Sequence, residues 1–527
     1  ATSTRPAPRR SASPSAPWTK GVEPLAAILR DGGTAADACI AMDAVLHVTE
    51  PTSTGLGGDA FALHFEGATG RVTALNASGR SPAALTLDAV RAAGPDGPPP
   101  SHGLWVTVPG CCAGWADLAA RHGSMPLARL LEPAIRLASD GFAVGPVTAA
   151  IWGRGLAQLQ SEELTIGGRA PAAGETFRNP GLARTLRAIA EGGSEAFYTG
   201  AIALAIANAV EQAGGVMTTA DLAAHASTWD EPIEATYRGT RVWQCPPNGQ
   251  GIVALLALNL LEGFAIGAPD DPRRWHLEIE ALRLAFADAR WWVSDPACGA
   301  PPVEALLSKE YAAERRALID PAGATLDAKR GSPVHRGGTV YHCAVDSRGD
   351  ACSMVSSHFM GFGSGVVPAG LGFVLHNRAL GFALDPAHPN VVAPGKRPYH
   401  TITPALLTRA DGALWGPLGV MGGFMQPQGH VQLVTALVDD GAAPQEALDR
   451  PRFYLDAGVA GGRVKLEEGV PAGVVAGLEA LGHEVDAGVP SYGRALFGRG
   501  QIILREPDGG LRGGSDRRAD GCALGVS

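Results

Sequence analysis

The sequence lacks long apolar runs, blocks of basic residues and regularly spaced cysteines, and each absence excludes a class of protein. No apolar run in the 527 residues approaches the roughly 18 that a membrane span needs, so no membrane contact is expected. The net charge of −9 and the scattered arginines and lysines argue against a nucleic-acid partner. The eight cysteines have no spacing typical of a metal site. We therefore expect neither a bound metal nor a cofactor.

The composition is that of a large globular protein. Hydrophobic residues make up 46% of the chain and charged residues 18%, and the length suits either two to four domains or one intertwined domain. Residues 1–17 are rich in Ser, Pro, Ala and Arg and contain no apolar stretch. They predict a disordered tail rather than a secretory signal, so a cytoplasmic location is expected.

The chain is organised around a stretch that begins with Gly337-Gly338 and continues as an alternating run from Thr339 to Val345. The alternation predicts a β-strand, whose odd-numbered and even-numbered side chains line opposite faces. The next residues, 347–349, predict a hairpin loop in which Gly349 is left-handed. Equal steps outward from this loop place Thr339 directly opposite Ser357, with Cβ atoms about 5 Å apart.

The facing hydroxyls of Thr339 and Ser357 allow two interpretations. They form either a Thr-Ser pair on a hairpin edge behind a flexible linker, or part of a site created by an autocatalytic cut before Thr339. In the second case the new α-amine of Thr339, whose ordinary pKa is near 8, can act as its base. Gly338 would tolerate the strained peptide that such a cut requires. Residues 322–336, which precede the cut, are expected to form an exposed loop.

Two other features resemble ligand sites. The glycine-rich turn at residues 55–58, before Asp59, resembles a phosphate loop. It follows a helix and lacks the Lys-Ser/Thr ending, so we reject that function. His276 and Glu280 lie four residues apart on a long predicted helix, residues 273–292, and could form half of a metal site. Because no third ligand is evident, we interpret them as a pair on the helix surface.

An ordered series of short segments, covering residue 18 to the end, resembles the γ-glutamyltranspeptidase family of N-terminal nucleophile hydrolases. Examples are Gly57-Gly58-Asp59 and Val108-Pro109-Gly110. The other segments are residues 32–38, 123–127, 197–200, 237–239, 259–263, 286–288, 338–339 and 515–521. No single segment is decisive, and the resemblance rests on their number and order.

The resemblance implies an α/β fold, the four-layer αββα sandwich of these hydrolases. It also implies self-cleavage between Gly338 and Thr339. The products would be a large subunit, residues 18–338 behind the tail, and a small subunit, residues 339–527. The two subunits would stay together as a heterodimer, and such heterodimers could pair.

The resemblance also assigns catalytic roles. Thr339 would be the nucleophile of both cleavage and turnover, and Ser357 its supporting hydroxyl. Gly422 and Gly423 would hold the tetrahedral oxyanion with backbone N–H groups, each of which is typically worth about 3 kcal/mol. The alternative for the two glycines is a plain turn.

The residues that bind the substrate's α-amine and α-carboxylate in this family are replaced here. The corresponding positions carry Gly381, Phe359, Arg378, His400, Thr401 and, for the carboxylate-binding arginine, Ser78, with Arg80 two positions later. A lost charge-assisted hydrogen bond costs roughly 1.5–3 kcal/mol, so glutathione is not the expected substrate. Residues 76–82 and 421–428 resemble the divergent acylase and amidohydrolase branch of the family.

The expected substrate is therefore a small molecule with another acyl group. Arg80, Arg378 and His400 are candidate ligands for an acidic acyl group, with a surface or structural salt bridge as the alternative for each. Phe359 and Thr401 are the other predicted substrate contacts.

Three functions follow from these assignments. The first is a self-processed hydrolase or acyltransferase that cleaves an amide or acyl bond through an acyl-enzyme on Thr339. The second uses the same nucleophile for C–C bond hydrolysis that removes a short acyl unit in antibiotic biosynthesis from a proline derivative. The third is an unprocessed, inactive relative that serves as a scaffold or binding protein. The intact Gly338-Thr339 pair, Ser357 and Gly422-Gly423 argue against the third.

Overall fold

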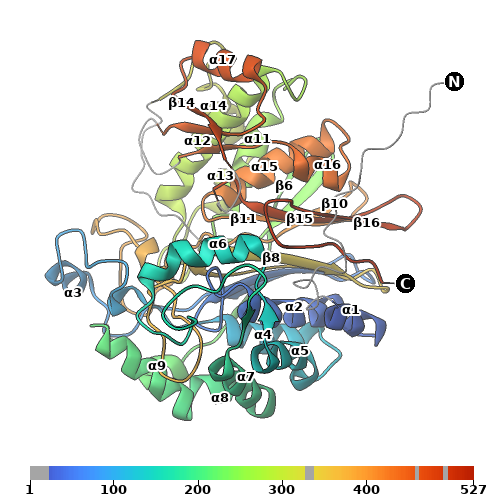
Figure 1. The fold of residues 1–527 in the computed structure, drawn as a ribbon. Coiled ribbons are helices and arrows are strands. Elements are labelled where there is room, and N and C mark those ends of the chain that lie inside the picture. The colour runs from blue at the N-terminus through green and yellow to red at the C-terminus, as the bar shows by residue number, and fades with distance from the viewer. Residues whose placement is uncertain (1–22, 327–337, 457–461, 491–495, 527) are drawn as a thin grey trace.

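Two antiparallel sheets lie face to face at the centre of the molecule, and helices cover the outer face of each (Figure 1). The computed structural model describes residues 23–326, 338–456, 462–490 and 496–526. The predicted tail, residues 1–17, and most of the predicted loop before Gly338 lie outside the described residues. The layers confirm the predicted αββα sandwich.

The first sheet contains both strands of the predicted hairpin. Its strand order is β5 (Thr228–Asp230), β2 (Val72–Ala77), β1 (Asp59–Phe65), β9 (Ala351–Phe359) and β8 (Gly338–Val345). The second sheet runs β16 (Leu511–Ser515), β15 (Arg499–Arg505), β11 (Leu414–Met421), β10 (Ala405–Thr408), β7 (Thr240–Gln244) and β6 (Ile233–Tyr237). The two small sheets are β12 (Phe453–Leu455), β13 (Val464–Glu467) and β14 (Val485–Val489), and β3 (Phe142–Ala143) with β4 (Thr176–Phe177).

Helices up to α9 cover the first sheet, and helices from α11 onward lie on the side of the second (Figure 1). On the first side are α1 (Glu23–Arg30), α2 (Ala35–Thr49), α4 (Cys111–His122), α5 (Leu127–Asp140), α7 (Pro180–Gly192), α8 (Glu195–Tyr198) and α9 (Gly200–Gln212). On the other side are α11 (Ile252–Leu261), α12 (Pro272–Trp292), α13 (Val303–Leu307), α14 (Lys309–Arg316), α15 (Met425–Val438), α16 (Pro444–Asp449) and α17 (Ala472–Ala480). Three further short helices are α3 (Leu87–Ala92), α6 (Pro146–Gly155) and α10 (Thr219–Ala223).

Side-chain alternation along the strands explains why the layers stack. In β1, Ala60 and Ala62 pack with the helices on one face, whereas Phe61 and Leu63 pack against the second sheet. Every residue of β1 is buried. A strand covered on both faces buries apolar area along its whole length, and burial of apolar area is the main favourable contribution to folding.

Both sheets combine strands from the two sides of the Gly338–Thr339 bond. In the first sheet β9 pairs with β1, and in the second sheet β10 pairs with β7. Separating the chain before and after this bond would break both ladders and expose the apolar layer between the sheets. Two fragments cut at this bond are therefore expected to remain associated.

Helix α15 begins at Met425, close behind the end of β11 at Met421. Pro427 lies in its first turn, where the N–H groups have no partner within the helix, so proline costs no hydrogen bond there. This start places the first turn of α15 directly behind Gly422-Gly423.

Because several histidines are buried, we expect the free energy of unfolding to fall in mild acid. Burial lowers the pKa of His64 to about 4 and the pKa values of His400 and His430 to about 3. The unfolded chain therefore binds protons below about pH 6.5 that the folded chain does not, and stability rises with pH. Each group contributes up to about 1.4 kcal/mol per pH unit. We expect the urea midpoint of the wild type to fall from pH 7 to pH 5, and that of His64→Leu to fall less over the same range. If the wild type loses no more than His64→Leu, protonation of His64 does not explain the loss of stability.

Candidate active site

The two predicted hydroxyls meet at the open end of the hairpin. Asp346 N–H donates to the Asp350 carbonyl at 3.0 Å, and Gly349 has a φ of 81°, so the predicted loop is confirmed. The β8–β9 ladder shifts by one residue between Gly338 and Val340, so strict Cα pairing does not extend to Thr339. The oxygens Thr339 Oγ1 and Ser357 Oγ nevertheless lie 3.1 Å apart, within hydrogen-bond distance.

N–H donors surround the two hydroxyls. Ser357 Oγ accepts a hydrogen bond from the backbone N–H of Phe359 at 2.9 Å and another from Arg378 at 3.3 Å. Thr339 Oγ1 accepts one from Gln426 Nε2 at 3.4 Å. The side-chain oxygen Oε1 of Gln426 accepts a hydrogen bond from the backbone N–H of Thr403 at 2.8 Å. This contact fixes the orientation of the Gln426 side-chain amide, so that its Nε2 faces Thr339. Thr339 and Ser357 are both fully buried in the intact chain.

Arg378 and Phe359, both predicted substrate contacts, lie beside the hydroxyl pair. The Arg378 guanidinium stacks over the Phe359 ring at 4.5 Å and donates to Thr401 Oγ1 at 3.0 Å. Phe359 has a φ of 74°, an unfavourable value for a bulky side chain. Such backbone strain is concentrated at functional sites.

A buried carboxylate, Asp59, lies behind Arg378. Asp59 Oδ2 is 3.5 Å from Arg378 Nε, 3.2 Å from His376 Nδ1 and 3.0 Å from His400 Nε2, and all four side chains are fully buried. The backbone N–H of Gly79 donates to Asp59 Oδ1 at 3.0 Å. His400 Nε2 thus contacts Asp59, while its Nδ1 accepts the backbone N–H of Ile402 at 3.3 Å.

The electrostatics of this cluster favour an ionised Asp59 and a neutral His400. Burial opposes ionisation of Asp59, but His376 and His400 hold its pKa well below the ordinary value. Burial lowers the pKa of Arg378 to about 10, so its guanidinium stays charged at neutral pH. Burial also lowers the pKa of His400 to about 3. The cluster therefore contains a buried Asp59–Arg378 ion pair next to Ser357.

The Gly422-Gly423 turn lies between β11 and α15. Gly422 has a φ of 131° and Gly423 a φ of 62°, conformations that favour glycine. Gln250 Nε2 donates to the Gly423 carbonyl at 2.9 Å and to the Thr401 carbonyl at 2.8 Å. This side chain therefore ties the turn to one of the predicted substrate contacts.

Arg80 forms a salt bridge with Asp295. Arg80 Nη1 lies 2.7 Å from Asp295 Oδ2, and the Arg80 side chain is 37% exposed. Asp295 also accepts the backbone N–H of Arg397 at 2.9 Å. The structure therefore gives Arg80 the salt-bridge partner that the sequence allowed as an alternative.

Three functional candidates were not predicted from the sequence: Asp59, His376 and Gln426. The sequence places Asp59 only at the end of a glycine-rich turn, which says nothing of its neighbours in the fold. Gly58 next to it signals a close approach, since a Cβ there would lie 2.5 Å from the Ser357 carbonyl oxygen. The sequence feature that could have identified Gln426 is its position three residues after Gly422-Gly423.

The prediction for His276 and Glu280 was wrong, because the pair is buried rather than on the helix surface. Their exposed fractions are 0% and 1%, since α12 packs between α11 and α17. His483 completes a group of three potential metal ligands, with His276 Nδ1 2.8 Å from His483 Nε2. Glu280 pairs with Arg283 at 3.1 Å, so protein partners already engage these groups.

A second group of potential ligands lies on the helix side of the first sheet. Asp43, His47 and Cys111 bring their ligand atoms within 4.8 Å of one another. Asp43 accepts hydrogen bonds from Trp115 Nε1 at 2.7 Å and from Ser356 Oγ. The Asp43 carboxylate is thus engaged by hydrogen bonds within the protein. Its bond to Ser356 holds β9 in place at the residue before Ser357.

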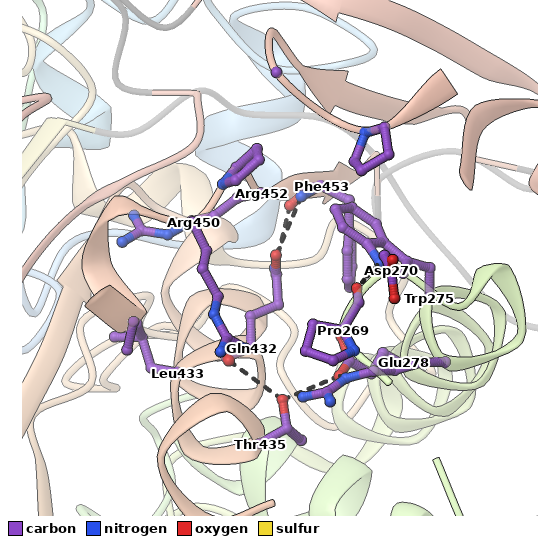
Figure 2. Close-up of a pocket in the computed structure, with 15 residues that line it drawn as sticks. Pro269, Asp270, Trp275, Glu278, Gln432, Leu433, Thr435, Arg450, Arg452 and Phe453 are labelled. Carbon is purple, nitrogen blue, oxygen red and sulfur yellow. Dashed lines mark hydrogen bonds and ion pairs between the residues drawn. The ribbon is translucent and has the colours of Figure 1, made fainter. Parts of the chain in front are cut away.

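A surface pocket of about 290 Å³ lies elsewhere, between α12, α15 and β12 (Figure 2). Gln432, on its wall, is six residues from Gln426, or about 9 Å along α15. The polar side chains that line the pocket bond to one another. Glu278 accepts a hydrogen bond from Arg274 at 3.2 Å and another from Thr435 at 3.0 Å. The pocket therefore does not contain the hydroxyl pair.

In the described part of the chain, no helix combines the length and the apolar character that crossing a membrane needs.

Comparisons with known proteins agree along the whole chain. The family model described as Gamma-glutamyltranspeptidase matches residues 25–526. The glutathione hydrolase-like YwrD proenzyme of Bacillus subtilis is 35% identical over 510 residues, which cover 95% of each chain. The oxamate amidohydrolase proenzyme of Klebsiella pneumoniae is 35% identical over 515 residues, again 95% of each chain.

A solved structure shows the same similarity. The cephalosporin acylase from Bacillus halodurans superposes with a TM-score of 0.87 at 43% identity, covering 95% of this chain and 93% of that chain.

Proposed function

This chain belongs to the gamma-glutamyltranspeptidase family, and we propose that it is a self-cleaving amide or acyl hydrolase whose nucleophile is Thr339. Its relatives are hydrolases and acylases, so the chain is an enzyme of that kind rather than an inactive scaffold. One observation carries the choice of nucleophile. Thr339 directly follows Gly338, and its Oγ1 lies 3.1 Å from Ser357 Oγ. Two relatives are named proenzymes, which supports a processing step.

Self-cleavage begins with attack of Thr339 Oγ1 on the carbonyl carbon of Gly338. The C–N bond breaks, the nitrogen takes the hydroxyl proton, and an ester joins Gly338 to the Thr339 side chain. Water then hydrolyses this ester, which leaves a carboxylate on Gly338 and a free α-amine on Thr339. Because Thr339 is fully buried in the intact chain, a substrate can reach it only after the Gly338 side has moved away.

Turnover uses the same oxygen. The α-amine of Thr339 takes the proton from Oγ1, which attacks the substrate carbonyl. The N–H groups of Gly422 and Gly423 stabilise the tetrahedral oxyanion. The leaving group departs with the proton, and water or an amine then releases the acyl group from Thr339.

The substrate class follows from the charges beside the hydroxyl pair. Arg378 is cationic, and Gly381 replaces the acidic residue expected to bind an α-amine, so the site favours an acyl group with an acidic end and no α-amine. Arg80 is the second candidate contact for the acidic end, and Phe359 and Thr401 would border the acyl chain. His400, held by Asp59, would support this wall rather than bind the substrate. The amidohydrolase and acylase names of the relatives agree with this class.

A matched pair of chromogenic substrates tests the class. Glutaryl-p-nitroanilide and γ-glutamyl-p-nitroanilide differ only by the α-amino group. We expect kcat/KM to favour the glutaryl compound by about 10- to 100-fold, because Gly381 replaces the acidic residue expected to bind the γ-glutamyl ammonium. The Asp59 carboxylate is already paired with Arg378, whose charge the ammonium meets. Hydrolysis of oxamate is measured in parallel, by the ammonia that it releases. An equal or higher kcat/KM for the γ-glutamyl compound would show that the site keeps the glutathione specificity.

The alternative of C–C bond hydrolysis stays a prediction. It requires the same nucleophile and oxyanion site and differs only in the bond next to the attacked carbonyl. Mass spectrometry of the products from a substrate panel distinguishes it from amide cleavage.

A further inference from the structure

We propose that Asp59 is a positioning residue of the active site, which acts through Arg378 to direct the Ser357 hydroxyl toward Thr339. The inference rests on the proposed function of Thr339 as nucleophile. It adds a requirement for a buried ion pair that takes no part in bond making or breaking.

The position of Asp59 on the sheet brings its carboxylate to the site. Asp59 begins β1 and is the Cα partner of Ser357 in the neighbouring strand β9. The close approach of the two strands at Gly58 leaves no room for a side chain there, because a Cβ would meet the Ser357 carbonyl oxygen at 2.5 Å. The carboxylate therefore lies next to the supporting hydroxyl, although 298 residues separate the two in sequence.

Arg378 links the carboxylate to the hydroxyl. Its Nε lies 3.5 Å from Asp59, its Nη1 donates to Thr401 at 3.0 Å, and its Nη2 donates to Ser357 at 3.3 Å. A guanidinium is planar, so contacts at Nε and Nη1, together with stacking on Phe359, fix the direction of Nη2. Without the Asp59 charge, a buried cation would remain uncompensated beside Ser357, which is costly.

The donors around Ser357 determine the direction of its own proton. A serine oxygen has two lone pairs and one O–H. The N–H of Phe359 and Nη2 of Arg378 can only donate, so they occupy the two lone pairs. In the proposed arrangement the Ser357 O–H donates to Thr339 Oγ1, whose oxygen lies 3.1 Å from Ser357 Oγ. Gln426 adds a weaker second donor at 3.4 Å, and the two donors together stabilise negative charge on the attacking oxygen.

The test measures Asp59→Asn in two backgrounds. Asparagine keeps the size of the side chain and an acceptor for the Gly79 N–H but removes the charge. In the wild-type background we expect self-cleavage and kcat to fall about 10- to 100-fold with KM for glutaryl-p-nitroanilide within threefold. We also expect the acidic limb of the kcat profile to move to lower pH, because the uncompensated Arg378 charge lowers the pKa of the Thr339 α-amine. In the Ser357→Ala background, which already lacks the hydroxyl, Asp59→Asn should change kcat less than twofold.

A purely structural Asp59 would slow both backgrounds equally, and that result would overturn the inference. Unchanged kcat in the wild-type background would overturn it as well. Arg378→Lys keeps the charge but carries it on a single nitrogen, which cannot replace the separate contacts of Nε, Nη1 and Nη2, so it should reproduce the Asp59→Asn loss of kcat. This variant carries the same comparison if Asp59→Asn does not fold. Asp37→Asn is the control, because Asp37 is a buried carboxylate that accepts hydrogen bonds from the Thr34 N–H and from the N–H and hydroxyl of Ser124, all neutral donors.

The outcome is separable from failure of the proposed function. If Thr339→Ala retains turnover, the nucleophile assignment fails whatever Asp59 does. If Thr339→Ala is inactive while Asp59→Asn matches the wild type, the nucleophile assignment stands and the positioning role alone is refuted.

Discussion

Thr339→Ala should remain a single uncleaved chain of 54.1 kDa and show no turnover above background. The substitution removes the oxygen that attacks Gly338 and the oxygen that would carry the acyl group. Losing a nucleophile in comparable hydrolases costs about 10⁶-fold in kcat. A denaturing gel followed over days measures cleavage, and glutaryl-p-nitroanilide measures turnover.

Thr339→Ser is the matched variant, because it keeps the hydroxyl and removes only a methyl group. It should cleave itself and retain measurable turnover. Two bands from Thr339→Ala, or equal turnover in Thr339→Ala and the wild type, would assign the nucleophile to another residue. The same gel also distinguishes an enzyme that processes itself from one that works intact.

Ser357→Ala is expected to slow self-cleavage and turnover together, by about 100-fold, within the range for a positioned proton-transfer or hydrogen-bonding group. The variant removes the hydroxyl 3.1 Å from Thr339 Oγ1 and leaves the Arg378 and Phe359 N–H groups without their acceptor. Time courses of the gel bands and kcat measured on the cleaved fraction provide the two rates.

Ser353→Ala is the control for that variant. Ser353 lies on the same face of β9, four residues away, and is equally buried. It hydrogen-bonds to Tyr341 at 3.0 Å and to the Ala405 N–H at 3.1 Å, so its loss costs similar polar contacts. We expect Ser353→Ala to lose stability but to keep kcat within twofold of the wild type. Equal slowing by both variants would indicate that the loss at Ser357 is structural.

The hairpin was predictable because its geometry is local. Alternation and the left-handed Gly349 sufficed to bring Thr339 close to Ser357. The one-residue shift at Gly338 was not predictable, since it depends on how the strand end packs rather than on the period of the pattern. The hydroxyl pair survives the shift because a side chain can span the small offset.

The charged cluster behind the hydroxyls depends on pairing between distant strands. Asp59 reaches Ser357 only through the β1–β9 register, and Arg378 arrives on a short 3₁₀ helix (Arg378–Gly381). Periodicity within one segment contains no information on such a register. The sequence therefore predicted Arg378 as a residue near the substrate and left its partner unidentified.

The same limit explains why His276 and Glu280 were wrongly predicted to lie on the helix surface. Spacing places both on one helix face but does not say whether that face meets solvent or another helix. Packing of α12 against α17 buries the pair and supplies His483. In contrast, the αββα sandwich was predictable through the family resemblance, because the resembling segments cover nearly the whole chain.

The most direct test of the account is the N-terminal residue of the smaller chain after incubation of the purified protein. Intact-mass analysis and N-terminal sequencing should show a chain that begins at Thr339, together with a larger partner that ends at Gly338. Turnover should appear in step with that chain. A smaller chain that begins elsewhere, or full turnover by an uncleaved protein, would contradict Thr339 as the nucleophile made by self-cleavage.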